Sequence, residues 1–298
     1  GVNKLYGNNG EDVLSGGAGD DLLEGGAGND NLIAGAGADT LDGGLGKDTI
    51  NITGSMTAAD VVVIDASDGT ASDSAGYLAT GAVTGAALGQ DTINGFDSSY
   101  DTVKIVATTG GFDHSADLSV GTGTGLTGEA AAAAGAVGYY ATNTLLVNTD
   151  DAAETFAGAG DIVITFSNFK AAGVDQLDAE NVLTKADVSG NIQYNLTGTT
   201  DANTFVGGDL ADTIDGAGGA DVITGGAGND TLTGNAAKDT ITGGAGADII
   251  AGGAGVDAIT TGLGRDIIKF VSDKDAGGGA PTTDSGFLVR ECTIVTVA

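Results

Sequence analysis

The sequence has few of the residues on which disulfide scaffolds, zinc sites and histidine-based catalysis depend. Its 298 residues include one cysteine, one histidine, one proline and no tryptophan. The single thiol, Cys292, excludes a disulfide within the chain. One histidine and one cysteine cannot supply the nitrogen and sulfur ligands of a zinc site. No apolar run is long enough to span a bilayer, so we expect no membrane insertion.

Basic residues are also scarce, with 10 Lys and Arg against 41 Asp and Glu and a formal net charge of −31. Such a chain is expected to repel nucleic acid and anionic membranes and to attract cations. Strong acidity is also typical of disordered chains, but aliphatic residues are plentiful here and regularly placed, which predicts a folded protein. Because the chain starts at Gly1 without a signal peptide, we expect a processed or excised piece of a longer protein.

Glycine is abundant, with 55 residues, and it recurs with a period of nine. One array has five blocks from Gly7 to Asn51, and another has seven from Gly207 to Lys269. Two degenerate blocks, beginning at Ser189, lead into the second array. In all twelve good blocks the eighth residue is Leu or Ile and the sixth is Asp. The sixth-position residues are Asp12, Asp21, Asp30, Asp39, Asp48, Asp212, Asp221, Asp230, Asp239, Asp248, Asp257 and Asp266.

Each block has the composition of a tight turn followed by a short strand. Glycines at the first, second and fourth places permit tight turning, and the last three residues place one aliphatic side chain inward. Stacked copies would bury a continuous aliphatic column. Burial of each Leu or Ile contributes roughly 1.5–3 kcal/mol, whereas ordering nine residues costs about 1 kcal/mol or more for each. The apolar column alone is therefore insufficient, and the turns need a further source of stability.

The sixth-position Asp residues indicate that this source is a metal ion. A carboxylate beside exposed turn carbonyls suits calcium, which takes six to eight oxygen ligands in irregular geometry, whereas magnesium demands a stricter octahedron. The pattern G-G-x-G-x-D-x-U-x resembles the nonapeptide repeat of the RTX family of secreted bacterial proteins. This resemblance implies an all-β fold with two right-handed parallel β-rolls, separated by a mostly antiparallel β cap or spacer region.

In this family two blocks form one coil, and calcium ions lie between neighbouring turns of the same edge. The resemblance therefore implies stacks of Asp12, Asp30 and Asp48; of Asp21 and Asp39; of Asp212, Asp230, Asp248 and Asp266; and of Asp221, Asp239 and Asp257. One ion for each neighbouring pair gives about eight calcium ions. Carbonyl ligands are expected near Gly16, Gly19, Gly25, Gly28, Gly43, Gly46, Gly225, Gly228, Gly243, Gly246, Gly252 and Gly255. The block from Gly234 lacks two of its glycines, so sites using Asn235 to Asp239 are in doubt. The block from Gly207 has Leu210 at its fourth place, and Asn203 replaces Asp in the block before it, so both resemble weakened or terminal capping coils.

The arrays divide the chain into four predicted regions: a first roll at 1–51, a β cap or spacer at 52–197, a second roll at 198–269 and a tail or partial cap at 270–298. Residues 90–106 are similar to the segment that caps the rolls of RTX proteases and lipases with antiparallel strands. Further strands are expected at Asp60–Ile64, Asn143–Asn148 and Asp161–Phe166, and a short helix at Glu129–Ala136. The tail Thr293–Ala298 loosely resembles the C-terminal signal of type I secretion.

No catalytic motif stands out, so we predict that the chain is not an enzyme and has no catalytic or organic-cofactor site. Gly123, Gly125 and Gly128 fit a dinucleotide-binding pattern, but a glycine loop is the better interpretation in so glycine-rich a chain. His114 has no G-x-S-x-G elbow to accompany it, and no H-E-x-x-H motif is present.

The predicted function is that of a calcium-dependent structural segment of an extracellular or cell-surface protein, exported by type I secretion. Surface-layer subunits and large adhesins with RTX arrays are the closest resemblance, so copies of the chain itself are expected partners in a lattice or filament. The alternative is a secretion and folding module of an exoenzyme, such as a protease, lipase or epimerase, whose catalytic domain lies outside this chain. A free calcium buffer is a third hypothesis.

Overall fold

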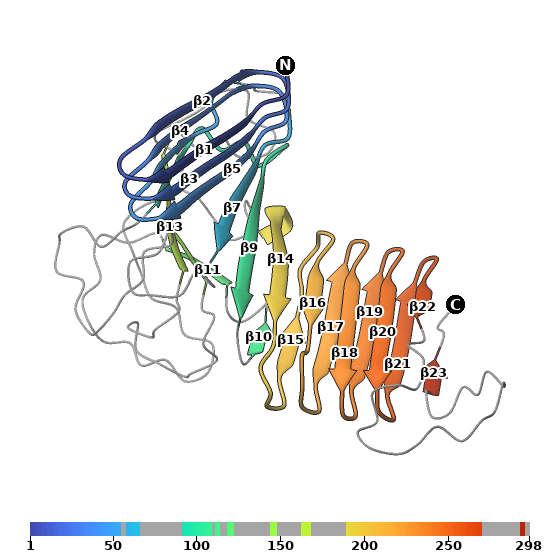
Figure 1. Cartoon of the computed structure of the whole chain (residues 1–298). Coiled ribbons are helices and arrows are strands. Elements are labelled where there is room, and N and C mark those ends of the chain that lie inside the picture. The colour runs from blue at the N-terminus through green and yellow to red at the C-terminus, as the bar shows by residue number, and fades with distance from the viewer. Residues whose placement is uncertain are drawn as a thin grey trace. The chain divides into compact units, whose positions relative to one another are not determined.

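The computed structural model describes residues 1–54, 58–65, 91–108, 111–113, 118–121, 144–147, 162–167, 189–269 and 293–295. Within these ranges the chain is all-β, and its strands form two compact units. One unit contains Gly1–Ala107 and His114–Gln193, and the other contains Thr108–Asp113 and Tyr194–Ala298. The described part contains no helix long and apolar enough to cross a membrane. The prediction of an all-β fold with parallel stacked coils is confirmed (Figure 1).

The first unit is a stack of coils in which alternate strands belong to opposite faces. One face has the order β1-β3-β5-β7-β9, and the other has β11-β12-β13-β8-β6-β4-β2. These strands are β1 (Lys4–Asn9), β2 (Val13–Ala18), β3 (Leu22–Ala27), β4 (Asn31–Ala36), β5 (Thr40–Leu45), β6 (Thr49–Asn51), β7 (Val61–Asp65), β8 (Asp91–Asn94), β9 (Thr102–Thr108), β11 (Leu118–Gly121), β12 (Thr144–Val147) and β13 (Ile162–Ser167). All pairings from β1 to β9 are parallel.

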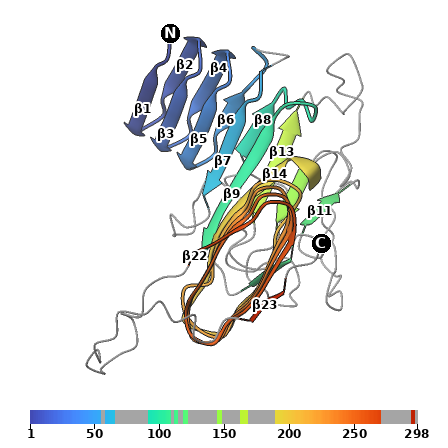
Figure 2. The same cartoon turned by 90° about the vertical axis from the view of Figure 1, so that its right-hand side faces the viewer.

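The second unit repeats this arrangement, and a short 3-10 helix (Ser189–Asn191) precedes its first long strand, β14 (Ile192–Thr197). One face has the order β14-β16-β18-β20-β22, and the other has β10-β15-β17-β19-β21-β23. The remaining strands are β10 (Gly111–Asp113), β15 (Thr204–Val206), β16 (Thr213–Asp215), β17 (Val222–Ala227), β18 (Thr231–Ala236), β19 (Thr240–Ala245), β20 (Ile249–Ala254), β21 (Ala258–Leu263), β22 (Ile267–Lys269) and β23 (Thr293–Val295). Viewed nearly along the axis of this unit, its coils superpose as a flattened ring (Figure 2).

The register of the strands places two nonapeptide blocks in each coil. Leu23 of β3 pairs with Leu5 of β1 and with Leu41 of β5, so equivalent residues stand 18 positions apart. The eighth-position side chains therefore stack inside the coil, and those of the inner coils are fully buried. The buried members are Leu23, Leu32, Leu41, Ile50, Ile214, Ile223, Leu232, Ile241, Ile250 and Ile259. These aliphatic columns form the core of both units.

Strands β7, β8 and β9 continue the first stack beyond the last nonapeptide block. The predicted antiparallel cap is wrong for these strands, since each joins in parallel. The physical reason is an Asp-x-aliphatic triplet at the start of each strand, beginning at Asp60, Asp91 and Asp101. This triplet supplies the same turn carboxylate and the same inward side chain as a nonapeptide block. Only the length of chain between triplets differs. Antiparallel pairing is seen where β12 lies between β11 and β13.

The strands predicted at Asp60–Ile64, Asn143–Asn148 and Asp161–Phe166 are confirmed as β7, β12 and β13, within one residue at each end. The helix predicted at Glu129–Ala136 lies outside the described residues.

A polar ladder joins the later strands of the first unit to the repeat array. The Asn51 side-chain amide donates to Asn31 Oδ1 at 2.8 Å, and that of Asn94 donates to Asn51 Oδ1 at 2.9 Å. Ser167 Oγ continues the ladder to Asn94 Oδ1 at 3.4 Å. Inside the coil, the rings of Phe96 and Phe166 pack edge to face with centroids 5.1 Å apart. The coil containing β8 and β13 is thus held by both polar and aromatic contacts.

Candidate metal centre

The sixth-position Asp residues end the glycine turns, and backbone hydrogen bonds fix their carboxylates. The Asp12 amide donates to Asp30 Oδ1 at 2.8 Å, and the Asp30 amide donates to Asp48 Oδ1 at 2.7 Å. In the second unit the Asp230 amide donates to Asp248 Oδ1 at 2.9 Å. Each carboxylate therefore accepts a hydrogen bond from the equivalent residue one coil earlier. This repeating contact arranges the carboxylates in files, which we call carboxylate columns.

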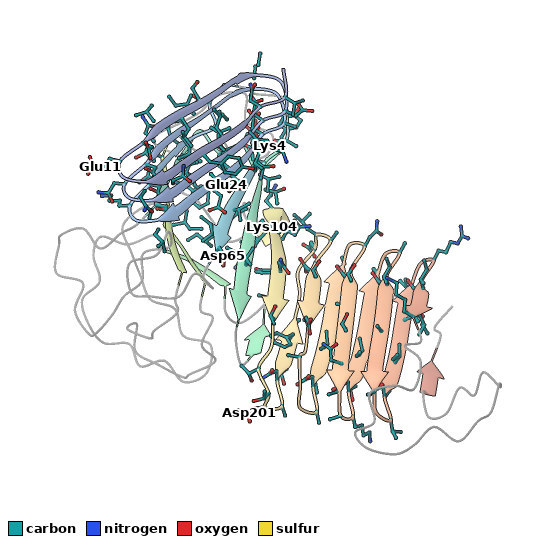
Figure 3. The ribbon with its side chains drawn as sticks, in the orientation of Figure 1. Lys4, Glu11, Glu24, Asp65, Lys104 and Asp201 are labelled. Atoms are coloured by element: carbon teal, nitrogen blue, oxygen red, sulfur yellow. The ribbon has the colours of Figure 1, made fainter. Side chains whose placement is uncertain are left out.

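The structure places all the predicted Asp residues in four carboxylate columns, two in each unit. The first unit has the columns Asp12, Asp30, Asp48 and Asp91, and Asp21, Asp39, Asp60 and Asp101. The second unit has the columns Asp212, Asp230, Asp248 and Asp266, and Asp221, Asp239 and Asp257. Other acidic residues lie outside the columns. Glu11 and Asp201, for example, are exposed on turns (Figure 3).

The second carboxylate oxygen is the chemically distinctive atom of the columns. In most members Oδ2 is buried and has no hydrogen-bond partner among the described residues. These members are Asp12, Asp21, Asp30, Asp39, Asp48, Asp60, Asp91, Asp221, Asp230, Asp239 and Asp248. A buried carboxylate oxygen without a partner is costly. Its repetition along four columns indicates a binding function that needs charged oxygen atoms, and not an isolated packing defect.

A second set of oxygens faces the same positions. A Cβ atom added to Gly25 would lie 2.5 Å from both Asp30 Oδ2 and the carbonyl oxygen of Gly43 in the next coil. At Gly16 the corresponding atoms are Asp21 Oδ2 at 2.7 Å and the Ala34 carbonyl oxygen at 2.6 Å. The space that a side chain would fill is therefore bounded by oxygens from two successive coils. Such a cradle suits a hard cation with oxygen ligands.

The glycines predicted to supply carbonyl ligands occupy two kinds of position. The carbonyl oxygens of the first-position residues Gly25, Gly43, Gly225, Gly243 and Gly252 face the cradles of the preceding coil. Those of the fourth-position residues Gly19, Gly28, Gly228 and Gly246 lie against the fourth-position glycine of the next coil. In the described ranges no three Asp, Glu, His or Cys side chains gather in one group. A bound cation would therefore take much of its ligand set from carbonyl oxygens.

Burial makes the columns electrostatically unfavourable on their own. It raises the pKa of Asp48 to about 7 and the pKa values of Asp230 and Asp239 to about 6. The pKa of Asp91 is raised well above its usual value, again mainly by burial and then by the neighbouring Asp48 carboxylate. The backbone hydrogen bonds act in the opposite direction but do not cancel these effects. A cation beside Oδ2 would favour the ionised form.

At two positions near the start of the second unit, backbone amides of the chain itself donate to the side-chain oxygens, and we call these turns closed. Asp212 accepts the Tyr194 amide at Oδ1 at 2.8 Å and the Gly208 amide at Oδ2 at 2.7 Å. Asn203 accepts the Thr199 amide at 2.8 Å in the adjacent turn. Both side chains thus satisfy their own turns, in keeping with terminal coils. Asp212 is therefore a predicted ligand whose surroundings depart from the repeating arrangement.

The turn from Gly234, whose missing glycines put its site in doubt, keeps the cradle. Asn235 and Ala237 adopt positive φ values of 70° and 81° in place of glycine. Asp239 Oδ2 remains buried and has no hydrogen-bond partner in the described part of the chain, and the Gly252 carbonyl oxygen lies 2.7 Å from the Cβ position of Gly234.

Sequence reasoning missed Asp60, Asp91 and Asp101 as members of the columns. They stand outside the nine-residue period, and their signal is the Asp-x-aliphatic triplet that opens β7, β8 and β9. Asp101 differs from the other two because its Oδ2 accepts the Asp97 amide at 2.7 Å.

Stacked parallel coils with columns of carboxylate and carbonyl oxygens define the class of calcium-binding β-solenoids. The comparison with protein families matches the RTX calcium-binding nonapeptide repeat in four copies, at residues 1–32, 15–50, 197–232 and 233–268. Both arrays are therefore RTX repeats, and the resemblance seen in the sequence is confirmed. The comparison with curated proteins gave no match. RTX repeats form a structural calcium-binding fold that is typical of secreted bacterial proteins, and their presence in both arrays indicates a calcium-binding structural segment.

Calcium-stripped protein is expected to gain β structure as the pH is lowered from about 7 to about 5. The folded-state pKa values of Asp48 and Asp230, about 7 and about 6, exceed the ordinary value of 3.8, so the folded state binds protons that the unfolded state does not. The stability from these groups is fully present below the ordinary pKa and is lost as pH rises through the folded-state values. Circular dichroism across this range measures the effect, and a β signal that is flat or falls on acidification would contradict it. Calcium-saturated protein is the control and should respond oppositely, because protons compete with calcium.

Proposed function

We propose that this chain is a calcium-dependent structural segment of a surface-layer, adhesin or other exoprotein assembly, and that it folds when it meets extracellular calcium. The observation that carries the proposal is the file of buried, unpartnered Oδ2 atoms facing carbonyl oxygens of the next coil. This arrangement repeats through both arrays, so the proposed ions act on the whole fold. Nothing in this role requires a catalytic group.

The proposed ions would hold successive coils together. The ligands of each ion would be column carboxylates, such as those of Asp30 and Asp230, together with carbonyl oxygens of the next coil, such as those of Gly43 and Gly243. Calcium supplies positive charge and accepts many oxygen ligands without strict geometry. About eight ions would bring about sixteen positive charges and offset roughly half of the net charge of −31. The proposed ions therefore act as cross-links between turns and as counterions for the acidic chain.

The proposal of a secreted segment is supported by the availability of calcium outside cells. Because the folded coil binds the ions and the free chain lacks preformed sites, calcium stabilises the fold by mass action. A chain exported through low calcium would remain unfolded until it reached high calcium. We propose that such folding follows type I secretion.

Assembly distinguishes a lattice protein from a secretion module. If the chain serves a surface layer or adhesin, millimolar calcium should drive it into ordered sheets or filaments, because calcium completes the rolls that pack against one another. Negative-stain electron microscopy and light scattering across calcium and protein concentrations measure this. Magnesium at the same ionic strength is the control for charge screening. A chain that remains monomeric under all these conditions would remove the lattice role and favour a folding module of an exoenzyme.

A further inference from the structure

We propose that Asp60 and Asp91, which lie outside both nonapeptide arrays, each hold a further calcium ion at the end of a carboxylate column of the first unit. This inference rests on the proposed function, since it extends the same columns. The RTX repeats matched in the first array end at residue 50, and neither residue belongs to a nine-residue block.

The backbone surroundings of Asp60 are those of a repeat Asp. Its Oδ1 accepts the amide of Asp39 at 2.9 Å, as Asp39 Oδ1 accepts that of Asp21 at 2.8 Å. The amide of the following residue, Val61, donates to the Asp39 carbonyl at 2.8 Å, as Thr40 does to Asp21. Asp60 therefore takes the next place in its column, although 21 residues and not 18 separate it from Asp39.

Asp91 continues the other column across a longer stretch of chain. Its Oδ1 accepts the amide of Asp48 at 2.8 Å, over a separation of 43 residues. The Thr92 amide donates to the Asp48 carbonyl at 2.9 Å, and Ile93 pairs with Ile50 in the core. The insertion before Asp91 changes neither the register nor the carboxylate position.

The Oδ2 atoms of both residues require a partner that the described chain does not supply. Asp60 and Asp91 are fully buried, and Oδ2 of each has no hydrogen-bond partner among the described residues. Oδ2 of the preceding residue in each column, Asp39 or Asp48, is likewise without a partner. One cation shared by the two residues would satisfy both oxygens.

Asp101 shows where this extension ends. It takes the place after Asp60 in its column, but Oδ2 accepts the Asp97 amide at 2.7 Å within its own turn. The chain thus supplies there the partner that is missing at Asp60. The other column ends because β13 places Ile164, and not Asp, beside Asp91. The extension therefore adds about two calcium ions, raising the expected total from about eight to about ten.

The test measures bound calcium in the 298-residue chain carrying Asp60→Asn and Asp91→Asn together. Asparagine keeps an oxygen for the Asp39 and Asp48 amides and replaces the charged Oδ2. The matched control is Asp20→Asn, which removes a charge from the same array. Asp20 Oδ1 accepts the Ala38 amide at 3.0 Å. At the equivalent place in the next block, Asn29 Oδ1 accepts the Lys47 amide at 3.0 Å, so an asparagine can make the hydrogen bond of Asp20. Asp230→Asn serves as a repeat-site variant.

We expect the double variant to bind about two calcium ions fewer than wild type at saturation, by dialysis and elemental analysis. It should also need more calcium to reach half of its β signal, whereas Asp20→Asn should match wild type. Unchanged calcium content and midpoint in the double variant would overturn the inference. If wild type binds no calcium, or Asp230→Asn loses none, the proposed function itself fails. Should the double variant not fold, the two single variants decide: a loss of one ion in each supports the inference, and no loss overturns it.

Discussion

Replacing Gly35 with alanine is expected to destabilise the calcium-saturated protein by about 2–4 kcal/mol, whereas replacing Gly17 costs only about 1 kcal/mol. Both are second-position glycines of the same face, with φ values of 108° and 93°. A Cβ at Gly35 would collide with the carbonyl oxygen of Gly17 in the preceding coil. A Cβ at Gly17 meets nothing within 4 Å. Gly35→Ala therefore combines backbone strain with a collision between coils, and Gly17→Ala has the strain alone.

Thermal or urea unfolding in saturating calcium measures the difference between these two variants. Gly218→Ala is a further control, because its Cβ would meet its nearest atom at an ordinary 3.6 Å. Asn235 and Ala237 show that some turns accept a side chain by adopting smaller positive φ values, 70° and 81°. Gly35 packs against a preceding coil and Gly17 does not, and this is the difference between the two sites. Equal losses of stability would therefore mean that the coils are not stacked as the structure has them.

The repeating parts of the fold could be predicted from the sequence because the residue types of each block indicate where its turn and its inward side chain lie. Asp at the sixth place and an aliphatic residue at the eighth keep phase through both arrays, and the stacking two blocks apart followed from the family resemblance. The hydrogen bond from the Asp12 amide to Asp30 Oδ1 could not be read from residue types, because it depends on backbone directions at the turn. It explains why the position is Asp, whose short side chain places one oxygen on the backbone and leaves the other for a ligand.

The non-repeating coils could not be predicted from the nine-residue period of the sequence. Asp60 follows Asp39 by 21 residues, and Asp91 follows Asp48 by 43, so any search for a fixed spacing misses both. Inserted chain leaves a solenoid at its turns without disturbing the strands, which is why spacing carries no information there. The short triplet of Asp, any residue and an aliphatic residue survives at Asp101, where Val103 is buried. Such a triplet is too common in an acidic chain to be decisive by itself.

The closed turns could be predicted only in part, because Leu210 and Asn203 mark blocks that resemble weakened or terminal coils but do not tell which oxygens the chain's own amides occupy. Asp212 has the same motif position as Asp230, yet its Oδ2 accepts the Gly208 amide, whereas Oδ2 of Asp230 has no hydrogen-bond partner within the described ranges. This turn departs from a regular block at Leu210, which stands at the place of the fourth glycine. Motif position therefore predicts that a residue joins a column, and the hydrogen bonding of Oδ2 separates a proposed cation ligand from a turn closed by the protein.

Removing calcium is expected to unfold most of the β structure of both units at neutral pH. Carboxylates of neighbouring coils stand about one strand spacing apart, about 4.8 Å, and repel by about 3 kcal/mol for each pair at an effective dielectric constant near 20. The aliphatic columns cannot offset this repulsion together with the ordering of the glycine turns. At a calcium concentration one hundred times the dissociation constant, each site restores about 2.7 kcal/mol. The effect should therefore exceed that of any single substitution.

Magnesium separates specific coordination from general screening. It has the same charge as calcium but keeps its waters and demands short, octahedral distances, which the mixed carbonyl and carboxylate cradles do not favour. Sodium chloride at matched ionic strength screens exposed charges but cannot supply the missing partner of a buried Oδ2. Both additions should leave chelated protein largely unfolded.

The most direct test is a circular dichroism titration of the chelator-treated chain at neutral pH. The chain should lose most of its β signal in chelator, recover it cooperatively with added calcium, and fail to recover it with magnesium. A chelated chain that keeps its full β signal and its melting temperature would show that the coils are stable without the ion, and would contradict the central claim that calcium in the carboxylate columns holds the coils together.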